Sequence, residues 1–169
     1  MTTILDLPDE IRLLIGKELS AKSIYSLIRV CRSLYSSFIP NLWSYLSIMH
    51  FKSGSVPAEQ VRVNAHRVKD LTFSSILKKD YYAIDYPQVH TLRMMTFYRD
   101  DKDDRYLRVL PQEKVDFLRR HPFIKKLIYQ HKDALPREFW EVVGTECVHL
   151  EELEFTGVVG QDAVDAFWR

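Results

Sequence analysis

One short motif recurs five times along the chain and restricts what the chain can fold into: an apolar residue, two variable residues, a leucine, a variable residue and another apolar residue. Its copies are WSYLSI (43–48), VKDLTF (68–73), VHTLRM (89–94), IKKLIY (124–129) and LEELEF (150–155). Residues two apart in a strand point to the same side, so the leucine and the last apolar residue of each copy can enter one core. The copies begin about 20 to 35 residues apart, a period typical of solenoid repeats. The sequence therefore predicts a row of short strands.

Helices are predicted between and after the later strands. The segments 113–120, 137–143 and 161–168 each carry apolar residues three or four positions apart. A recurring order of strand, connection and helix is typical of a solenoid with parallel strands and outer helices.

The first fifty residues follow a helical pattern instead. Pro8 suits the first position of a helix, and Asp9 and Glu10 suit its first turn, where the helix dipole favours negative charge. Apolar residues then line one side of the predicted helix, at Ile11, Leu14, Ile15 and Leu19. Arg12, Lys17 and Glu18 are left for the other side. Gly16 weakens such a helix by about 1 kcal/mol, unless close packing requires a residue without a side chain.

A second helical pattern runs from Ile24 to Phe38, and Pro40 is predicted to end it. Either two short helices or one bent helix would fit this segment. Three helical pieces in fifty residues cannot each bury a full face in so small a core. Some apolar surface is therefore expected to remain for a partner or for the rest of the chain.

Composition excludes several classes of function. The chain has 24 lysines and arginines against 23 acidic residues, a net charge of +1, which gives no general reason to expect nucleic acid or an anionic membrane as partner. No stretch approaches the ~20 apolar residues of a membrane-spanning helix. Cys31 and Cys147 form no metal-ligand spacing, and no apolar secretory segment follows Met1. These features predict a reducing compartment, cytoplasm or nucleus.

A helix-turn-helix is an alternative interpretation of the N-terminal helices. Its second helix would enter the major groove of DNA. The segment SIYSLIRVCRSLYSSF, residues 23–38, offers only Arg29 and Arg32 as cations, which is too little for phosphate neutralisation. DNA binding is therefore disfavoured.

Catalytic chemistry has little support in the sequence. Cys147 and His149 are two apart, and in a strand they would share one face. Without a third ligand or an oriented base, a buried thiol is the better interpretation of Cys147. No glycine-rich phosphate loop is present, and we predict a non-catalytic protein with no cofactor and no metal.

The N-terminal motifs together resemble an F-box, in their order and in their spacing. The resemblance is carried by LPDEI at 7–11, VCR at 30–32 and LW at 42–43. Two positions depart from the family: Ser23 and Ile24 stand where it often has Asp-Leu, and Leu34 stands where an aromatic residue is common. The later motifs resemble the irregular leucine-rich repeats that often follow an F-box. We therefore expect an α/β chain with a three-helix F-box at 1–48 and, at 49–169, a short leucine-rich-repeat solenoid of about four to five strand units.

The F-box resemblance implies that the N-terminal helices bind the Skp-type adaptor of a cullin ubiquitin ligase. The positions that match the adaptor-facing part of the motif are Leu7, Pro8, Ile11, Val30 and Cys31. Ile15, Leu19, Leu27 and Trp43 are expected in the core behind them, from their central place in the apolar stripe. The chain would then be a substrate adaptor that brings a protein target to the ligase. The alternative is a module that uses the same F-box for assembly or regulation without delivering a target.

The strands predict where a target would bind. Residues between the buried positions of each strand face the concave side of a solenoid. The predicted target-binding residues are Thr72, Arg93, Ile128, Gln130 and Glu154. They are mixed in charge and chemistry, so they identify no particular target.

The C-terminal residues give a last expectation. Solenoids cover their ends with a polar capping element, whereas Phe167 and Trp168 extend the apolar stripe of a predicted helix. We therefore expect a short or truncated repeat array whose C-terminal end exposes apolar surface.

Overall fold

The computed structural model describes residues 3–48, 56–74, 79–95, 111–130, 135–157 and 165. The chain divides into two compact units, Met1–Tyr45 and Leu46–Arg169. Phe167 and Trp168, on which the expectation of an exposed C-terminal end depends, lie outside the described residues. No helix in the described ranges is both long enough and apolar enough to cross a membrane.

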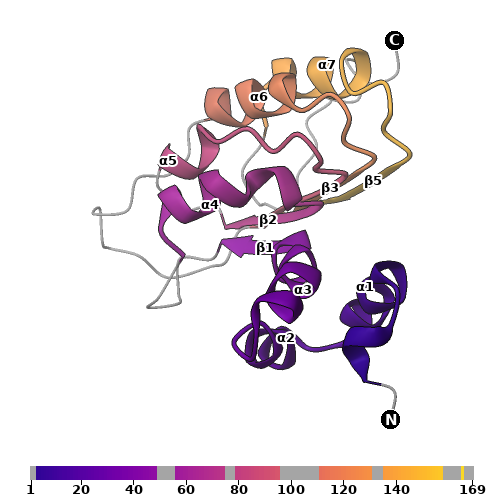
Figure 1. Ribbon diagram of the computed structural model, residues 1–169. Coiled ribbons are helices and arrows are strands. Elements are labelled where there is room, and N and C mark those ends of the chain that lie inside the picture. Colours follow the sequence, from indigo (N-terminus) through magenta and orange to yellow (C-terminus); the bar gives the residue numbers. More distant parts are fainter. Residues whose placement is uncertain are drawn as a thin grey trace. The chain divides into compact units, whose positions relative to one another are not determined.

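The first unit consists of a short 3-10 turn and three helices (Figure 1). They are η1 (Ile4–Asp6), α1 (Asp9–Glu18), α2 (Ala21–Leu27) and α3 (Arg32–Ser44). The Ser20 side chain caps α2, since its Oγ accepts the backbone N–H of Ser23 at 3.2 Å. Of the two alternatives left open by the sequence, separate helices α2 and α3 are correct.

The core of the first unit lies where its three helices meet. Ile24, Leu34 and Phe38 are buried, and half-buried apolar residues of α1, α2 and α3 pack against them. These residues include Ile15, Leu19 and Leu27, as predicted. Trp43 is half-buried and is not among the residues of this cluster.

The sequence predicted that Pro40 would end the third helix, but it does not. It lies inside α3, which continues to Ser44. A proline within a helix costs about 3 kcal/mol because it removes one backbone hydrogen bond and crowds the preceding turn. Burial of Phe38 and Ile39 on one side of Pro40, and packing of Leu42 on the other, offset this cost.

Gly16 is required by close packing between α1 and α3. A Cβ atom at this position would lie 2.6 Å from Cγ and Oδ1 of Asn41. The Asn41 amide also donates a hydrogen bond from Nδ2 to the carbonyl oxygen of Leu13, at 3.0 Å. The predicted reason for a glycine in this helix is therefore confirmed.

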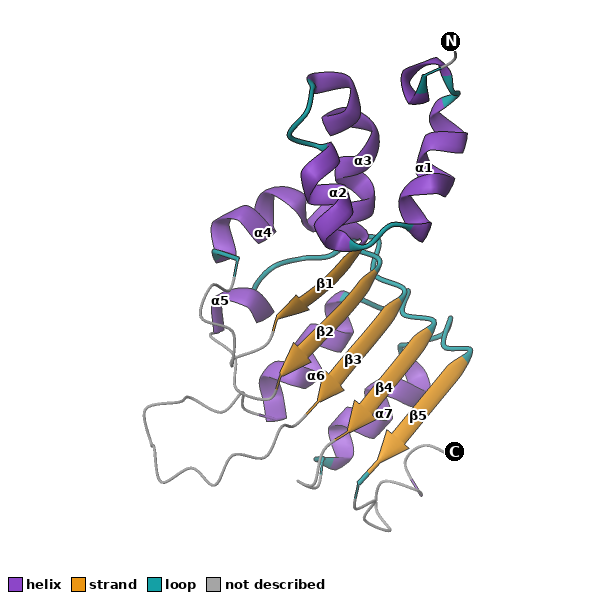
Figure 2. Cartoon of the chain, turned by 90° about the horizontal axis from the view of Figure 1, so that it is seen from below, coloured by secondary structure: helices purple, strands orange, loops and turns teal. Residues whose placement is uncertain are grey.

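A five-stranded sheet forms the second unit, with the strand order β1-β2-β3-β4-β5 (Figure 2). The strands are β1 (Tyr45–Ile48), β2 (Asp70–Ser74), β3 (Thr91–Met95), β4 (Lys126–Gln130) and β5 (Glu152–Thr156). The pairs from β2 to β5 are parallel, and all five arrows point the same way in Figure 2. Each predicted motif therefore contains a strand. The first apolar residue of each motif precedes its strand instead of joining it, as at Val68 and Val89.

The sheet register aligns equivalent residues of the motifs. Leu71 pairs with Leu92, Leu92 with Leu127, and Leu127 with Leu153. Two residues further along, Phe73, Met94, Tyr129 and Phe155 form a second row. Both rows are buried across β2, β3 and β4, as expected for residues that point to the same face.

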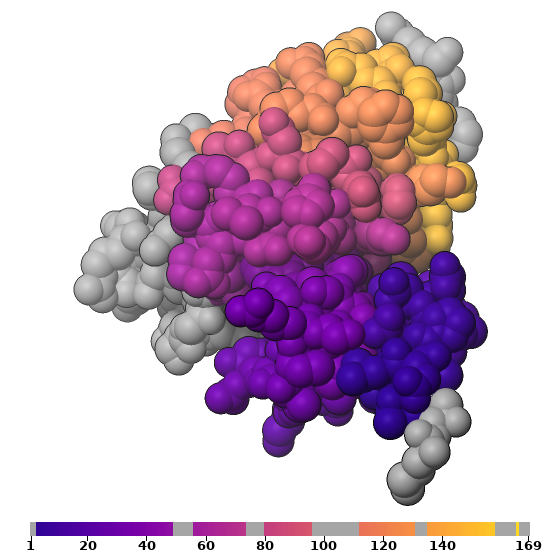
Figure 3. Space-filling view, viewed as in Figure 1, coloured from indigo at the N-terminus to yellow at the C-terminus, as the bar shows by residue number. Residues whose placement is uncertain are grey.

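Helices cover one face of the sheet (Figure 2). The helices of the second unit are α4 (Ala58–Asn64), α5 (Lys79–Tyr82), α6 (Pro111–Arg120) and α7 (Arg137–Thr145). The predictions for α6 and α7 are confirmed, whereas α4 and α5 were not predicted. Of the helix predicted at 161–168, only Asp165 is described, in a helical conformation. Side chains fill the spaces between these helices in the space-filling view (Figure 3).

Aromatic rings make up much of the core between helices and sheet. Phe73 of β2 stacks on Tyr82, with ring centroids 4.5 Å apart, and Phe117 of α6 meets Phe73 edge-on at 5.3 Å. Further along the sheet, Tyr129 of β4 stacks on Phe155 of β5, with ring centroids 5.4 Å apart. These rings join neighbouring strands and helices into one core.

One backbone turn precedes four of the strands. The N–H groups of Val68, Val89, Ile124 and Leu150 each donate to the carbonyl three residues earlier, at 3.0–3.4 Å. The carbonyl of the residue before β2, β3 or β4 then accepts two N–H groups. One belongs to the residue before the next strand and the other to the first residue of that strand. The accepting carbonyls belong to Lys69, His90 and Lys125. The same local geometry thus recurs along the sheet.

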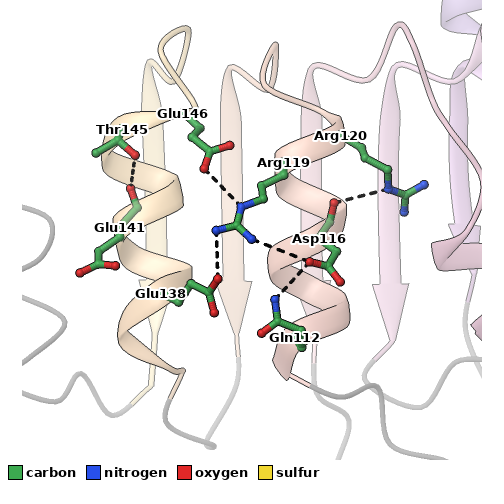
Figure 4. A network of polar contacts seen from close by, with 8 residues as sticks. All are labelled: Gln112, Asp116, Arg119, Arg120, Glu138, Glu141, Thr145 and Glu146. Carbon is green, nitrogen blue, oxygen red and sulfur yellow. Dashed lines mark hydrogen bonds and ion pairs between the residues drawn. The ribbon is translucent and has the colours of Figure 1, made fainter.

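Charged side chains join α6 to α7 on the outside of the helix layer (Figure 4). Arg119 of α6 contacts Glu138 at 2.9 Å and Glu146 at 3.3 Å, and Asp116 lies 4.0 Å away on its own helix. The hydrogen bond to Glu146, followed by that to Glu138, raises the pKa of Arg119. Because these groups are exposed to solvent, the network aligns the two helices more than it stabilises the fold.

Candidate functional site

The predicted adaptor-facing residues lie in two segments of the first unit. Leu7 and Pro8 precede α1, and Ile11 lies in its first turn, whereas Val30 and Cys31 lie between α2 and α3. Leu7 is half-buried, and the other four are exposed to solvent. The exposed fractions of Ile11 and Val30 are 42% and 70%, high values for aliphatic side chains.

The start of α1 is fixed by the backbone of Pro8. Its carbonyl oxygen accepts the N–H groups of Ile11 and Arg12, both at 3.1 Å. Pro8 thus caps α1 and lies one position before its first helical residue, Asp9, whereas the sequence predicted Pro8 at the first helical position. Asp9 and Glu10 occupy the first turn, as predicted. Leu7, the residue before the proline, is extended, because the proline ring disfavours a helical backbone at that position.

Arg12 joins the two segments. Its guanidinium contacts the Asp9 carboxylate at 2.5 Å and donates to Ser33 Oγ at 3.4 Å. Ser33 is two residues beyond Cys31, so the beginnings of α1 and α3 lie close together. The sequence pattern assigned Arg12 to the solvent side of the helix. This assignment was wrong, since only 12% of its side chain is exposed. The Asp9 to Arg12 spacing was the one sequence signal for this role.

Further apolar side chains are exposed on the same unit. The exposed fraction is 54% for Leu14 and 37% for Leu13 on α1, and 50% for Tyr35 on α3. Leu14 was grouped with the stripe that includes the core residues Ile15 and Leu19, but it points away from the core. Small domains seldom leave this much apolar area in water unless a partner covers it.

On the sheet, four of the five predicted target-binding residues form one row. The register pairs Thr72 with Arg93, Arg93 with Ile128, and Ile128 with Glu154. Gln130 lies in a second row, between Met95 and Thr156. The row alternates with the buried leucine and aromatic rows, so it belongs to the face of the sheet without helices.

Two of these residues are not accessible as predicted. Thr72 is only 1% exposed and Ile128 only 7%, whereas Gln130 and Glu154 are exposed and Arg93 is half-buried. Thr72 has a short side chain on an inner strand, where longer neighbours project beyond it. Alternation along a strand predicts the direction of a side chain but not the height of its neighbours.

The open face also carries paired charges. Arg93 Nη1 lies 3.7 Å from Asp70 Oδ1, and Lys126 Nζ lies 2.6 Å from both Glu152 Oε1 and Glu154 Oε1. The hydrogen bond from Lys126 lowers the pKa of Glu154, and the bond to Glu152 is the main reason that the pKa of Lys126 is raised. Asp70 and Glu152 share this face by alternation, but they were missing from the predicted set because only positions after the leucine of each motif were chosen.

The cysteine and histidine considered for catalysis are not arranged for it. Cys147 and His149 lie in the turn between α7 and β5, not in a strand. Cys147 is buried, and burial raises the pKa of its thiol to about 11. The His149 ring stacks on Phe123 at 5.4 Å. In the described ranges, no three metal-binding side chains lie close enough together to hold an ion.

His121 has a structural role in the turn before β4. Its Nδ1 donates to the Phe117 carbonyl oxygen at 2.7 Å, and its Nε2 accepts the backbone N–H of Tyr86 at 2.9 Å. Because an N–H group can only donate, Nε2 must be unprotonated, and the ring is neutral. Burial lowers the pKa of His121 from its usual 6.5.

The His121→Gln substitution is expected to weaken the pH dependence of stability. In the native chain, the unfolded state takes up a proton near pH 6.5 but the folded state only at lower pH, so stability falls as the pH drops through this window. Urea titrations between about pH 7.5 and 5 measure the slope. The exposed residue His90 provides the control, and a His90→Gln slope equal to that of His121→Gln would contradict this assignment.

Comparison with known proteins identifies the N-terminal part of the chain. Residues 4–49 match the F-box-like family model. The matched range begins at η1 and extends one residue beyond β1, so it contains all three helices of the first unit and the five predicted adaptor-facing positions. The chain therefore carries an F-box-like domain. No curated protein matches the chain in sequence.

Proposed function

We propose that this chain is a substrate-recognition subunit of a Skp–cullin–F-box ubiquitin ligase. In this proposal residues 1–48 bind a Skp-type adaptor and residues 49–169 hold a protein target. The observation that carries the proposal is the F-box-like match over residues 4–49, whose adaptor-facing positions are mostly exposed. The site of action would be the cytoplasm or the nucleus.

The geometry of the first unit supports adaptor binding. Arg12 brings the segment that contains Leu7, Pro8 and Ile11 close to the segment that contains Val30 and Cys31. Exposed aliphatic side chains at the beginning of α1 and in the turn before α3 suit the groove of a helical partner, where a few anchors supply most of the binding energy.

The second unit is best explained as a set of irregular leucine-rich repeats. Four strands follow the same four-residue turn, and equivalent leucines align across the sheet although the connecting segments differ in length. Such arrays commonly bind proteins through an extended sheet face. Of the predicted target-binding residues, Arg93, Gln130 and Glu154 are the three with accessible side chains.

This function needs no bond chemistry from the chain itself. A bound target would be held near the ubiquitin-conjugating enzyme of the ligase, which raises the effective concentration of its lysines. F-box proteins are generally non-catalytic subunits, and the buried, protonated thiol of Cys147 agrees with that role.

Adaptor capture by purified protein tests the proposal. The Pro8→Ala and Ile11→Ala double variant is expected to retain less Skp-type adaptor than the native chain, because it removes one rigid and one aliphatic contact. Circular dichroism checks that the variant is folded. Undiminished retention by the folded double variant would refute the proposed interface.

The same F-box could serve assembly without degradation, and co-expression separates the two functions. A substrate-recognition subunit is expected to cause ubiquitin-dependent loss of its bound protein, and this loss should disappear in the double variant. A bound protein that stays stable in both cases would favour the assembly module.

A further inference from the structure

The outer edge of β5 is an unfinished edge of the parallel sheet. In the ranges that the structure describes, β5 pairs with β4 on one side and with no strand on the other. Among the described residues, its outward-facing N–H and C=O groups have no strand partner. Exposed strand edges of this kind bind extended peptides through backbone hydrogen bonds.

The two apolar rows of the sheet are only partly buried at this edge. Leu92 and Leu127 are fully buried, whereas Leu153, which continues their row, is only half-buried. Phe155 is half-buried as well, with one face stacked on Tyr129 and its edge against Trp140 of α7 at 5.0 Å. A further strand with apolar residues opposite Leu153 and Phe155 would complete both rows.

The charges across the sheet indicate the chemistry of that strand. Within the described part of the chain, Lys126 is the cation within ion-pair distance of both Glu152 and Glu154, so these two carboxylates share its positive charge. About half of each glutamate side chain is exposed, 53% for Glu152 and 49% for Glu154. In a parallel register, a lysine or arginine on the next strand would lie directly opposite them, as Lys126 lies opposite Glu152.

We propose that the β5 edge binds an extended segment of a protein partner, parallel to β5, with basic residues opposite Glu152 and Glu154 and apolar residues opposite Leu153 and Phe155. A second copy of this chain fits less well, because β1, the other outermost strand in the described ranges, has the sequence YLSI and carries no cation. The inference rests on the proposed function in one respect, that the segment belongs to the target. Its test contains no adaptor, so the two can fail separately.

The test uses the full chain and a fluorescent ten-residue peptide with the central sequence Lys-Leu-Arg-Phe. Fluorescence anisotropy is expected to show saturable binding that weakens with added salt. The Glu152→Lys and Glu154→Lys double variant should bind this peptide at least about tenfold more weakly. The same variant should bind a peptide with the central sequence Glu-Leu-Glu-Phe better than the native chain does. Because both glutamates are exposed, the variant is expected to fold.

Two controls separate edge binding from general charge attraction. The Glu59→Lys and Glu141→Lys double variant makes the same charge change on α4 and α7, and it should bind the basic peptide almost as well as the native chain. N-methylation of the peptide amides that face β5 should abolish binding, because it removes the backbone hydrogen bonds.

Several results would overturn this inference. They are the absence of saturable binding, equal losses in the two double variants, and equal binding of the N-methylated peptide. A dimer of the chain that the peptide dissociates would assign the edge to a second copy and would overturn it as well.

Discussion

The Val30→Asp substitution is expected to weaken adaptor binding by about 2–4 kcal/mol, roughly 30- to 1000-fold. Val30 is 70% exposed in the turn between α2 and α3, so the substitution should leave the fold intact. In an apolar interface, the new carboxylate would lose its hydration without gaining a partner. Isothermal titration of the purified chain with a Skp-type adaptor measures the change.

Val63→Asp is the matched control for this prediction. Val63 lies in α4 of the second unit and is 65% exposed, so the same chemical change is made at nearly the same exposure. Adaptor affinity should change less than about twofold, as is usual for a surface substitution away from an interface. Similar losses in both variants would remove Val30 from the interface.

The Phe117→Ala substitution is expected to lower the free energy of unfolding of the second unit by about 3–5 kcal/mol. Phe117 is fully buried in α6, where its ring lies 5.3 Å from Phe73, 5.6 Å from Tyr82 and 4.1 Å from His121. Its removal would leave a cavity between α6, β2 and α5. Urea unfolding followed by near-ultraviolet circular dichroism measures the loss.

Phe123→Ala provides the comparison, since Phe123 is 61% exposed in the turn before β4. It should cost less than about 1 kcal/mol, because little of the ring is removed from water. If Phe123→Ala were as destabilising as Phe117→Ala, burial would not explain the difference between these two phenylalanines.

The strands could be predicted because their signal is local and repeated. Within each motif, the leucine and the last apolar residue point into one core, and five copies reinforce one another. In contrast, α4 and α5 are short and bury few side chains, Val61 in α4 and Tyr81 and Tyr82 in α5. Segments of four to seven residues are too short for a helical period to be recognised.

The candidate sites were only partly predictable, because burial depends on neighbours that are distant in sequence. Ile11 and Val30 were assigned from their match to the F-box motif and are exposed, which is compatible with contact to a partner. Thr72 was assigned to the accessible surface by alternation, but the neighbouring strands bury it. Arg12 shows the same limit, since its link to Ser33 crosses between two helices and leaves no pattern in the sequence of either.

The repeated turn before the strands has an evolutionary consequence. Successive turns are joined through the carbonyls of Lys69, His90 and Lys125, so the connections between turns differ in length without disturbing these bonds. If the stretch of chain from one turn to the next were duplicated or deleted, every remaining turn would still have an equivalent neighbour. Such a sheet can lengthen or shorten by whole units, and the charges on its open face can then diverge from unit to unit to suit different partners.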